Sequence, residues 1–288
     1  MKNPIVDGWY ADPEARTYNG ADYVYVTRSL PFREQKNLDC VILREGKDPE
    51  IVSGVVDMTG FPWVTHAVWA PTAIEKNGKY YLIFASNNIQ KDEEPGGLEI
   101  AVSDDPRGPF CAILDRPLLD HFVYGAQPID AHLFKDDDGT VYLYFGGWGH
   151  CVFAKMNENM DGFSPLPDGE IFREITPEGY VEGPCMMKRA GKYRFMYSTG
   201  NWTDGSYGVC VSTADRPEGP FIGAEKILEA QPPTADGPGH NGYLQKENGD
   251  FIVYHRRTVG DLNPHHRQLC IDELHFDEKG GMLPVIMT

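Results

Sequence analysis

The chain has 288 residues, of which 41% are hydrophobic, 12% aromatic and 24% charged, a composition typical of a globular protein. Its 43 acidic residues against 26 lysines and arginines give a net charge of −17, which would repel a nucleic-acid backbone. No apolar run approaches the roughly 20 residues of a membrane span. These properties argue against a nucleic-acid-binding protein and a membrane protein.

The amino-terminal residues and the cysteines bear on the compartment. Residues 1–4, Met-Lys-Asn-Pro, lack the apolar core of a secretory signal, so we expect a cytoplasmic chain, or a periplasmic or secreted one after removal of a signal peptide. The cysteines include no C-x-x-C pair, and most stand among apolar or β-branched residues. We therefore predict buried free thiols rather than zinc ligands or disulfides. The cysteines are Cys40, Cys111, Cys151, Cys185, Cys210 and Cys270.

Short aromatic and β-branched runs predict five strands, and each run follows a turn sequence that suits a tight hairpin. The runs are residues 23–26, 80–84, 141–145, 193–197 and 251–254. The turns before them are Asn19-Gly20, Asn77-Gly78, Asp138-Gly139, Ala190-Gly191 and Asn248-Gly249. No amphipathic helical window exceeds about three turns. The pattern predicts an all-β protein.

The five hairpins recur at intervals of about 50–60 residues, which indicates a repeat architecture. Two repeats also share a Gly-Pro-Phe segment, at residues 108–110 and 219–221, which we expect to lead from one unit to the next. Five units of about 58 residues each can hold a four-stranded blade and a loop. The sequence therefore predicts a five-bladed β-propeller that forms a single domain over residues 1–288, with no linker.

Three carboxylates precede the predicted hairpins in similar surroundings. In a propeller the inner strand of every blade lies beside one axis, so residues ahead of these hairpins can meet at the centre. Asp12, Asp130 and Glu182 each stand alone beside apolar, aromatic or Gly-Pro residues, where burial raises a carboxyl pKa and suits it to proton transfer. Each has a structural alternative, as a turn residue, a buried acceptor of backbone N–H groups or a salt-bridge partner. Their recurrence at matching blade positions favours a catalytic set.

Five motifs in order resemble glycoside hydrolase family 43, which contains β-xylosidases, α-L-arabinofuranosidases and arabinanases on a five-bladed propeller. The similarity runs from Asn3 to Gly281 and implies one catalytic module without the C-terminal β-sandwich that many xylosidases of the family add. The motifs are Ala11-Asp12-Pro13, Trp69-Ala70-Pro71, Ile129-Asp130-Ala131, Val181-Glu182-Gly183-Pro184 and Gly237-Pro238-Gly239-His240.

The resemblance implies an inverting mechanism with three acids. Asp12 would be the general base that activates water, and Glu182 the general acid that protonates the leaving oxygen. Asp130 would hold and tune Glu182. The chemistry agrees, because an inverting site needs one ionised and one protonated carboxyl, separated by roughly 6.5–9.5 Å to admit water.

The resemblance also marks residues around these acids. His240 matches an axial histidine that often lies near a bound Ca²⁺ in the central channel, the alternative being a histidine satisfied within a Gly-rich turn. Arg267 matches an arginine that contacts the terminal sugar and the base, the alternative being a plain surface arginine. Trp69 stands in a matched motif as a sugar-contacting aromatic, the alternative being a core residue. Glu14 and His132 depart from the usual motifs, and His132 has no assigned role. No organic cofactor is expected.

The expected partner is a pentose-containing oligosaccharide or polysaccharide of the plant cell wall. The favoured activity is that of an α-L-arabinofuranosidase, with β-xylosidase and arabinan-cleaving activity as alternatives. A non-catalytic carbohydrate-binding propeller would not need three acids. A retaining fructan hydrolase is disfavoured, because its Asn-Asp-Pro-Asn and Arg-Asp-Pro segments are absent. Further aromatic candidates for the sugar site are Trp9, Phe61, Trp63, Trp148 and Trp202.

Overall fold

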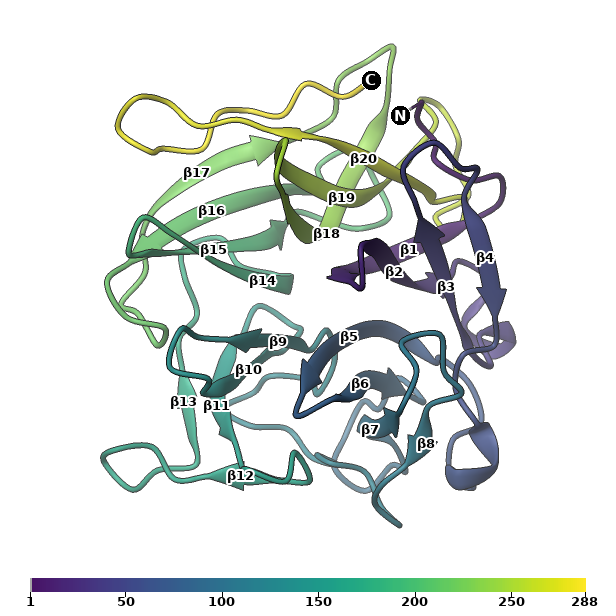
Figure 1. Cartoon of the computed structure of the whole chain (residues 1–288), viewed down its shortest axis with the longest axis vertical. Coiled ribbons are helices and arrows are strands. Elements are labelled where there is room, and N and C mark those ends of the chain that lie inside the picture. Colours follow the sequence, from purple (N-terminus) through teal and green to yellow (C-terminus); the bar gives the residue numbers. More distant parts are fainter. Residues whose placement is uncertain (1) are drawn as a thin grey trace.

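The structure, a computed structural model, describes residues 2–288 and consists almost entirely of strands. The strands form five antiparallel sheets in sequence order, which surround a central axis as the blades of a propeller (Figure 1). Within residues 2–288 the only helical segments are two short 3-10 turns, Phe32–Glu34 and Met58–Gly60, and no helix is long and apolar enough to cross a membrane. The prediction of an all-β, five-bladed propeller is confirmed.

Each blade is built from consecutive strands of the chain. Blade 1 contains β1 (Tyr10–Tyr18), β2 (Ala21–Arg28), β3 (Leu38–Leu43) and β4 (Glu50–Ser53). Blade 2 contains β5 (Trp69–Lys76), β6 (Lys79–Ser86), β7 (Gly97–Ser103) and β8 (Cys111–Ala112). Blade 3 contains β9 (His132–Lys135), β10 (Val141–Phe145), β11 (Val152–Met156), β12 (Phe163–Ser164) and β13 (Phe172–Glu174). Blade 4 contains β14 (Glu182–Arg189), β15 (Lys192–Thr199), β16 (Gly208–Ala214) and β17 (Ile222–Leu228), and blade 5 contains β18 (Asp236–Lys246), β19 (Gly249–Arg257) and β20 (Gln268–Leu274).

Two details of the blades differ from the prediction. Blade 5 has three strands rather than four, and the outer edge of blade 3 is split between β12 and β13, which both pair with β11. The two Gly-Pro-Phe segments do not lead to the next blade, because they connect the third and fourth strands of blades 2 and 4. A sequence repeat gives the length of each unit, but it does not show at which residue one blade ends and the next begins.

The predicted hairpin turns join the first two strands of the blades. In blades 1, 2 and 4 both central residues of the turn have positive φ, for example 51° at Asn19 and 77° at Gly20. This is the backbone of a type I′ turn, whose twist matches that of the flanking strands, and Asn and Gly adopt it at little cost. Local chemistry therefore sets the register of these inner hairpins.

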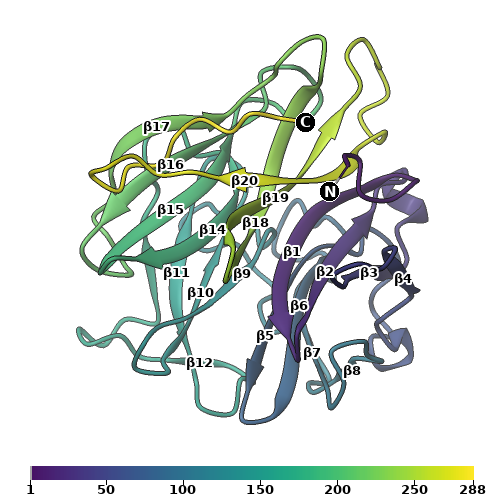
Figure 2. The same cartoon turned by 45° about the horizontal axis from the view of Figure 1, so that its top comes forward.

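Segments near the two ends of the described chain join the ring beside blade 5 (Figures 1 and 2). The side chain of Asn3 both accepts from and donates to the backbone of Ile271 in β20, and the backbone N–H of Ile5 donates to Leu269. Near the other end, the N–H of Val285 donates to the carbonyl of Ile227 in β17. Hydrogen bonds of this kind bind blade 5 to its neighbours on both sides.

The hydrophobic core lies between neighbouring blades, where aromatic and aliphatic side chains of adjacent sheets interlock. All six cysteines are free thiols, and five of them are buried in these layers, as predicted. The exception is Cys111 in β8, which is exposed because β8 is a two-residue edge strand at the outside of blade 2.

Candidate active site

The inner strands share a backbone distortion at one level of the propeller axis. In each blade one residue at this level has a positive φ, and in β1, β5, β14 and β18 the strand pairing shifts at the same point. Such a bulge re-aims side chains at the end of a strand and is common beside active sites. The five residues are Asp12 (φ 50°), Ala70 (47°), Asp130 (54°), Gly183 (62°) and His240 (40°).

This alignment corrects the prediction that the three carboxylates occupy matching positions. Asp12 and Asp130 do match, and His240 matches them in blade 5. Glu182 does not, because the positive φ of blade 4 lies at Gly183, so Glu182 stands one residue earlier, at the position of Trp69 in blade 2. Glu182, predicted from sequence as the general acid, therefore lies one residue earlier in its blade than Asp12 and Asp130 do in theirs.

Asp12 is a buried carboxylate held by positive charge. The Nη1 of Arg267 lies 2.8 Å from Asp12 Oδ1, and the Nδ1 atoms of His240 and His255 each lie 3.6 Å from the same oxygen. Burial by itself raises the pKa of Asp12, but Arg267 and the two imidazoles outweigh it and lower the pKa to about 2. The Nε of Arg267 donates to Ser29 Oγ, which fixes the guanidinium against the carboxylate. Asp12 is therefore ionised at neutral pH.

Glu182 and Asp130 have the opposite electrostatics. Burial, reinforced by the charge of Asp12, raises the pKa of Glu182, although a hydrogen bond from Tyr207 Oη at 2.8 Å to Oε1 opposes the rise. Burial and the neighbouring Glu182 and Asp12 raise the pKa of Asp130 well above its usual range. Asp130 Oδ2 accepts the N–H of Gly183 at 3.0 Å, which ties it to the strand that carries Glu182. Two such carboxyls retain a proton at a pH where an exposed pair would have lost it.

His240 lies between two of the carboxylates. Its Nδ1 is 3.6 Å from Asp12 Oδ1 and 3.4 Å from Asp130 Oδ2, and burial lowers its pKa despite the charge of Asp12. Ca²⁺ takes six to eight oxygen ligands. Within residues 2–288 no group of three or more His, Cys, Asp or Glu residues could hold a metal ion. The described side chains around His240 therefore do not by themselves complete a calcium site, and calcium in the central channel stays a prediction.

An aromatic group surrounds Arg267 beside the carboxylates. The rings of Trp69, Trp202 and His265 lie with centroids 4.9 Å, 6.0 Å and 5.5 Å from that of Phe32, and the Arg267 guanidinium lies 5.5 Å from the Trp202 ring. Trp69 and Arg267, both predicted to contact sugar, thus lie in one group, linked through Phe32 and Trp202. The Nε1 of Trp69 and the Nδ1 of His265 are buried without a hydrogen-bond partner in the described part of the chain. Such a group offers apolar faces and free polar atoms to a polar ligand.

A buried polar network fills the channel beneath the carboxylates. Glu14, two residues after Asp12, accepts from Thr72 Oγ1 at 2.9 Å, and its Oε2 lies 3.2 Å from His132 Nδ1. The Nε of Arg16 lies 2.8 Å from Glu14 Oε1 and also donates to a backbone carbonyl of blade 2. Burial is outweighed by Arg16 and His132, so the pKa of Glu14 is lowered. The two residues that departed from the usual motifs therefore join blades 1, 2 and 3.

Several residues of the site were not found from sequence. Tyr207, which donates to Glu182, lies immediately before β16, and His255, whose Nδ1 accepts the N–H of Asp12 at 3.3 Å, lies within β19. Phe32 and His265 lie in loops of blades 1 and 5. None of the four stands in a repeated motif, so only the three-dimensional arrangement reveals them.

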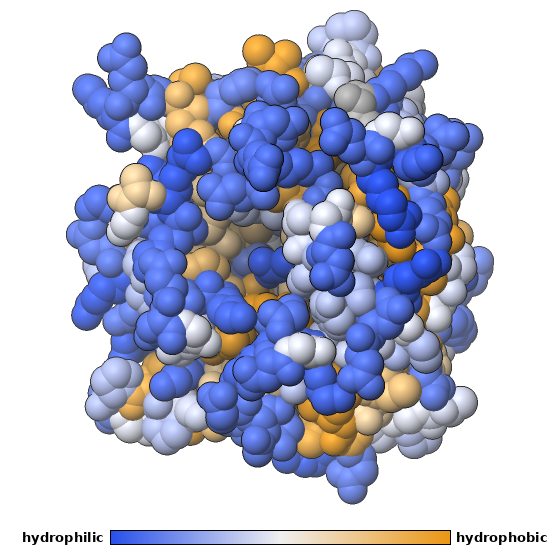
Figure 3. Space-filling view, viewed as in Figure 1, coloured by the Kyte–Doolittle hydropathy of each residue, from blue (hydrophilic) through white to orange (hydrophobic). Residues whose placement is uncertain are grey.

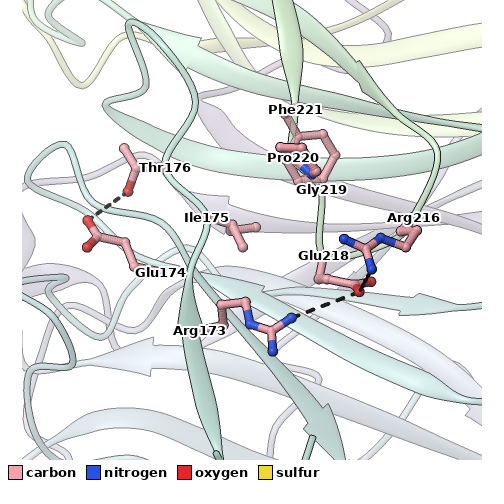
Figure 4. A pocket seen from close by; sticks show the side chains of 9 residues that line it. All are labelled: Arg173, Glu174, Ile175, Thr176, Arg216, Glu218, Gly219, Pro220 and Phe221. Carbon is pink, nitrogen blue, oxygen red and sulfur yellow. Dashed lines mark hydrogen bonds and ion pairs between the residues drawn. The ribbon is translucent and has the colours of Figure 1, made fainter. Parts of the chain in front are cut away.

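Two hollows of the described surface differ in the chemistry of their side chains. The ring is hollowed near its centre, where apolar side chains show between polar ones (Figure 3). A pocket at the outer edge, between blades 3 and 4, is lined by charged residues that pair with one another (Figure 4). There Glu218 lies 3.9 Å from Arg173 and 3.6 Å from Arg216. That pocket contains none of the carboxylates described above.

Comparisons with known proteins agree with this geometry. The sequence pattern of "Glycosyl hydrolases family 43" matches residues 1–282. A β-D-galactofuranosidase from Aspergillus niger is 41% identical over 99% of this chain and 85% of its own length. The crystal structure of a thermostable family-43 glycoside hydrolase has a TM-score of 0.82 and 26% identity, covering 100% of this chain and 96% of that one. An α-L-arabinofuranosidase structure from Clostridium thermocellum has a TM-score of 0.78 and 28% identity, covering 96% and 94%. The chain belongs to glycoside hydrolase family 43 and is a hydrolase.

Proposed function

We propose that this chain is an inverting glycosidase that removes pentose units, foremost α-L-arabinofuranosyl units, from plant cell-wall oligosaccharides or polysaccharides. One observation carries the mechanism. Within a single buried site the pKa of Asp12 is lowered to about 2 while the pKa of Glu182 is raised. Two carboxyl groups whose environments push their pKa values apart are the signature of a base and an acid that act together.

Asp12 acts as the general base. Its ionised carboxylate accepts a proton from a water molecule as the water oxygen attacks the anomeric carbon. The guanidinium of Arg267 keeps Asp12 ionised and offers its remaining N–H groups to hydroxyls of the terminal sugar, as a planar fork can do. The N–H of Asp12 donates to His255, so the backbone that carries the base is fixed as well.

Glu182 acts as the general acid. It gives its proton to the glycosidic oxygen as the bond to the anomeric carbon breaks, so the leaving group departs as a neutral alcohol. Asp130 acts through Glu182, since the nearby carboxyl opposes ionisation and helps the pair retain a proton. Bond formation to water and bond cleavage occur in one displacement, and the anomeric centre is inverted.

The proposed sugar rests on the relatives and on the shape of the ring. The Clostridium thermocellum structure is described as an α-L-arabinofuranosidase, and the Aspergillus niger relative as a β-D-galactofuranosidase. The two glycosyl units share a furanose ring of the same configuration, and galactofuranose carries one further hydroxymethyl group on its exocyclic carbon. The relative at 41% identity therefore makes the β-D-galactofuranosyl unit the second candidate. β-Xylosidase and arabinan-cleaving activity stay as alternatives.

A panel of glycosides tests the proposal. Purified protein is incubated with the 4-nitrophenyl glycosides of α-L-arabinofuranose, β-D-galactofuranose and β-D-xylopyranose, and kcat/KM is measured for each. The proposal expects the largest value for the arabinofuranoside. The largest kcat/KM on the galactofuranoside would change the proposed sugar but leave the enzyme a furanosidase. The largest kcat/KM on the xyloside would contradict the assignment as a furanosidase. The Glu182→Gln variant, assayed on the corresponding disaccharides, serves as the inactive control.

A further inference from the structure

Two neighbouring turns on blade 3 hold aromatic residues in an unusual backbone conformation. In one turn the residues with positive φ are Tyr124 (51°) and Gly125 (83°), and in the other they are Trp148 (58°) and Gly149 (79°). Both are closed by backbone hydrogen bonds of a tight turn, including His150 N–H to the Gly147 carbonyl. A bulky side chain is disfavoured at positive φ, where asparagine or glycine is usual.

Trp148 also leaves much of its apolar surface in contact with solvent. The residue is 54% exposed, and its one aromatic partner among residues 2–288 is Phe122, whose ring centroid lies 4.9 Å away at an interplanar angle of 49°. A folding role does not account for this placement, since the ring is neither buried nor in a favourable backbone region. A strained and exposed aromatic side chain points instead to a ligand.

The turn of Trp148 is attached to the strand that carries the general acid. The N–H of Gly149 donates to the carbonyl of Val181 at 3.1 Å, and Tyr180 Oη donates to the carbonyl of Gly146 at 2.6 Å. Val181 immediately precedes Glu182. The turn that carries Trp148 is therefore fixed beside the backbone that leads into Glu182, on the blade 3 side of that strand.

We propose that Trp148, supported by Phe122, is a stacking platform for the sugar of the leaving group. This inference rests on the proposed function, in which Glu182 protonates the glycosidic oxygen. The leaving group must then lie on the Glu182 side of the site, whereas the terminal sugar lies by Asp12 and Arg267. The apolar face of a sugar ring packs on an indole, and a platform fixed to residue 181 keeps that ring in line with the acid.

Tyr124 provides a matched control in the adjacent turn. It is 50% exposed and also has positive φ, but its hydroxyl donates to the carbonyl of Phe172 at the start of the outer strand β13, at 3.2 Å. Its ring is thereby committed to the outside of blade 3. Trp148→Asn and Tyr124→Asn each place a residue suited to positive φ in a tight turn, so neither substitution should harm the fold.

The test compares leaving groups with and without a sugar ring. For both variants and the wild type, kcat/KM is measured on α-1,5-L-arabinobiose and on methyl α-L-arabinofuranoside, or on the β-D-galactofuranosyl counterparts if that sugar is cleaved. Trp148→Asn should lower the ratio of kcat/KM on the disaccharide to kcat/KM on the methyl glycoside about 10-fold. The change should come chiefly from a higher KM for the disaccharide, because the stacking contact with its leaving sugar is lost. Tyr124→Asn should leave the ratio unchanged, and the melting temperature of both variants should equal or exceed that of the wild type.

Two results would overturn the platform. An unchanged ratio in Trp148→Asn would show that the ring does not contact the leaving group. A lower melting temperature with equal losses on both substrates would show that Trp148 serves the fold. If the wild type cleaves neither substrate pair, the proposed function has failed instead, and this is seen before any variant is compared.

Discussion

The charge that Arg267 places beside Asp12 allows the strongest test of the acid–base assignment. Arg267→Met removes a guanidinium nitrogen that lies 2.8 Å from Asp12 Oδ1 and leaves the carboxylate buried. At an effective dielectric constant of about 20, two unit charges about 3 Å apart interact by about 5 kcal/mol, which corresponds to about 4 pKa units. The pKa of Asp12, lowered to about 2 in the native site, should therefore rise to between about 5 and 6.

The pH dependence of kcat/KM on an activated aryl furanoside measures this change, because it reports the groups of the free enzyme. A general base works when ionised, so activity is present above its pKa and is lost as the pH falls through it. The wild type should show no acid limb until it unfolds, whereas Arg267→Met should show one between about pH 5 and 6. Arg267→Lys retains the charge and should show a much smaller shift.

Loss of activity in Arg267→Met without movement of the acid limb would refute the reasoning. It would mean that Arg267 binds sugar but does not hold Asp12 ionised, or that Asp12 is not the base. Brief incubation at each pH, followed by assay at neutral pH, separates titration from unfolding.

Three further predictions concern the other acids. Asp130→Asn should shift the basic limb of the pH profile to lower pH, since Glu182 loses a neighbour that opposes its ionisation, and a basic limb that stays in place would contradict this role. Glu182→Gln should abolish cleavage of disaccharides but spare much of the activity on aryl glycosides with good leaving groups, and equal losses on both would exclude a general acid. Glu14→Ala should lower the free energy of unfolding in urea by about 3 kcal/mol, because it leaves the guanidinium of Arg16 without its partner. The control Glu50→Ala removes two exposed ion pairs, with Arg44 and Arg107, and should change the free energy of unfolding far less. Similar effects of the two substitutions would show that the network around Glu14 has no special structural role.

The propeller could be predicted because its signals are local. Asn19-Gly20 and Asn77-Gly78 determine their turns by their own backbone preferences, and the inner hairpins follow from them. The strand count of blade 5 could not be predicted in this way. That blade is completed by hydrogen bonds from residues near the two ends of the described chain, such as Asn3 and Val285, and such pairings between distant segments leave no local pattern.

In the site, too, some features could be predicted from the sequence and others could not. Asp12, Asp130 and Glu182 come together as predicted, but their relative positions were wrong by one residue in blade 4. The signal was present, because aligning Pro13 with Pro184 places Gly183 opposite Asp12. The supporting residues had no such signal.

The residues that set the pKa values of the acids could not be predicted from the sequence. Tyr207, just before β16, acts on Glu182, and His255 in β19 acts on Asp12; nothing in their neighbouring residues marks them. Glu14 and His132 could be recognised as departures, but their pairing across the channel depends on the closed ring. Electrostatic tuning is a property of the assembled site rather than of any motif.

The anomeric configuration of the first product tests the central claim most directly. Hydrolysis of the preferred furanoside is followed by proton NMR from the earliest time points, before the released sugar mutarotates. A single displacement, with Asp12 as base and Glu182 as acid, predicts β-L-arabinofuranose from an α-L-arabinofuranoside, or α-D-galactofuranose from a β-D-galactofuranoside. Early accumulation of the retained anomer would contradict the account, because it requires a covalent intermediate that an Asp12 acting through water does not form.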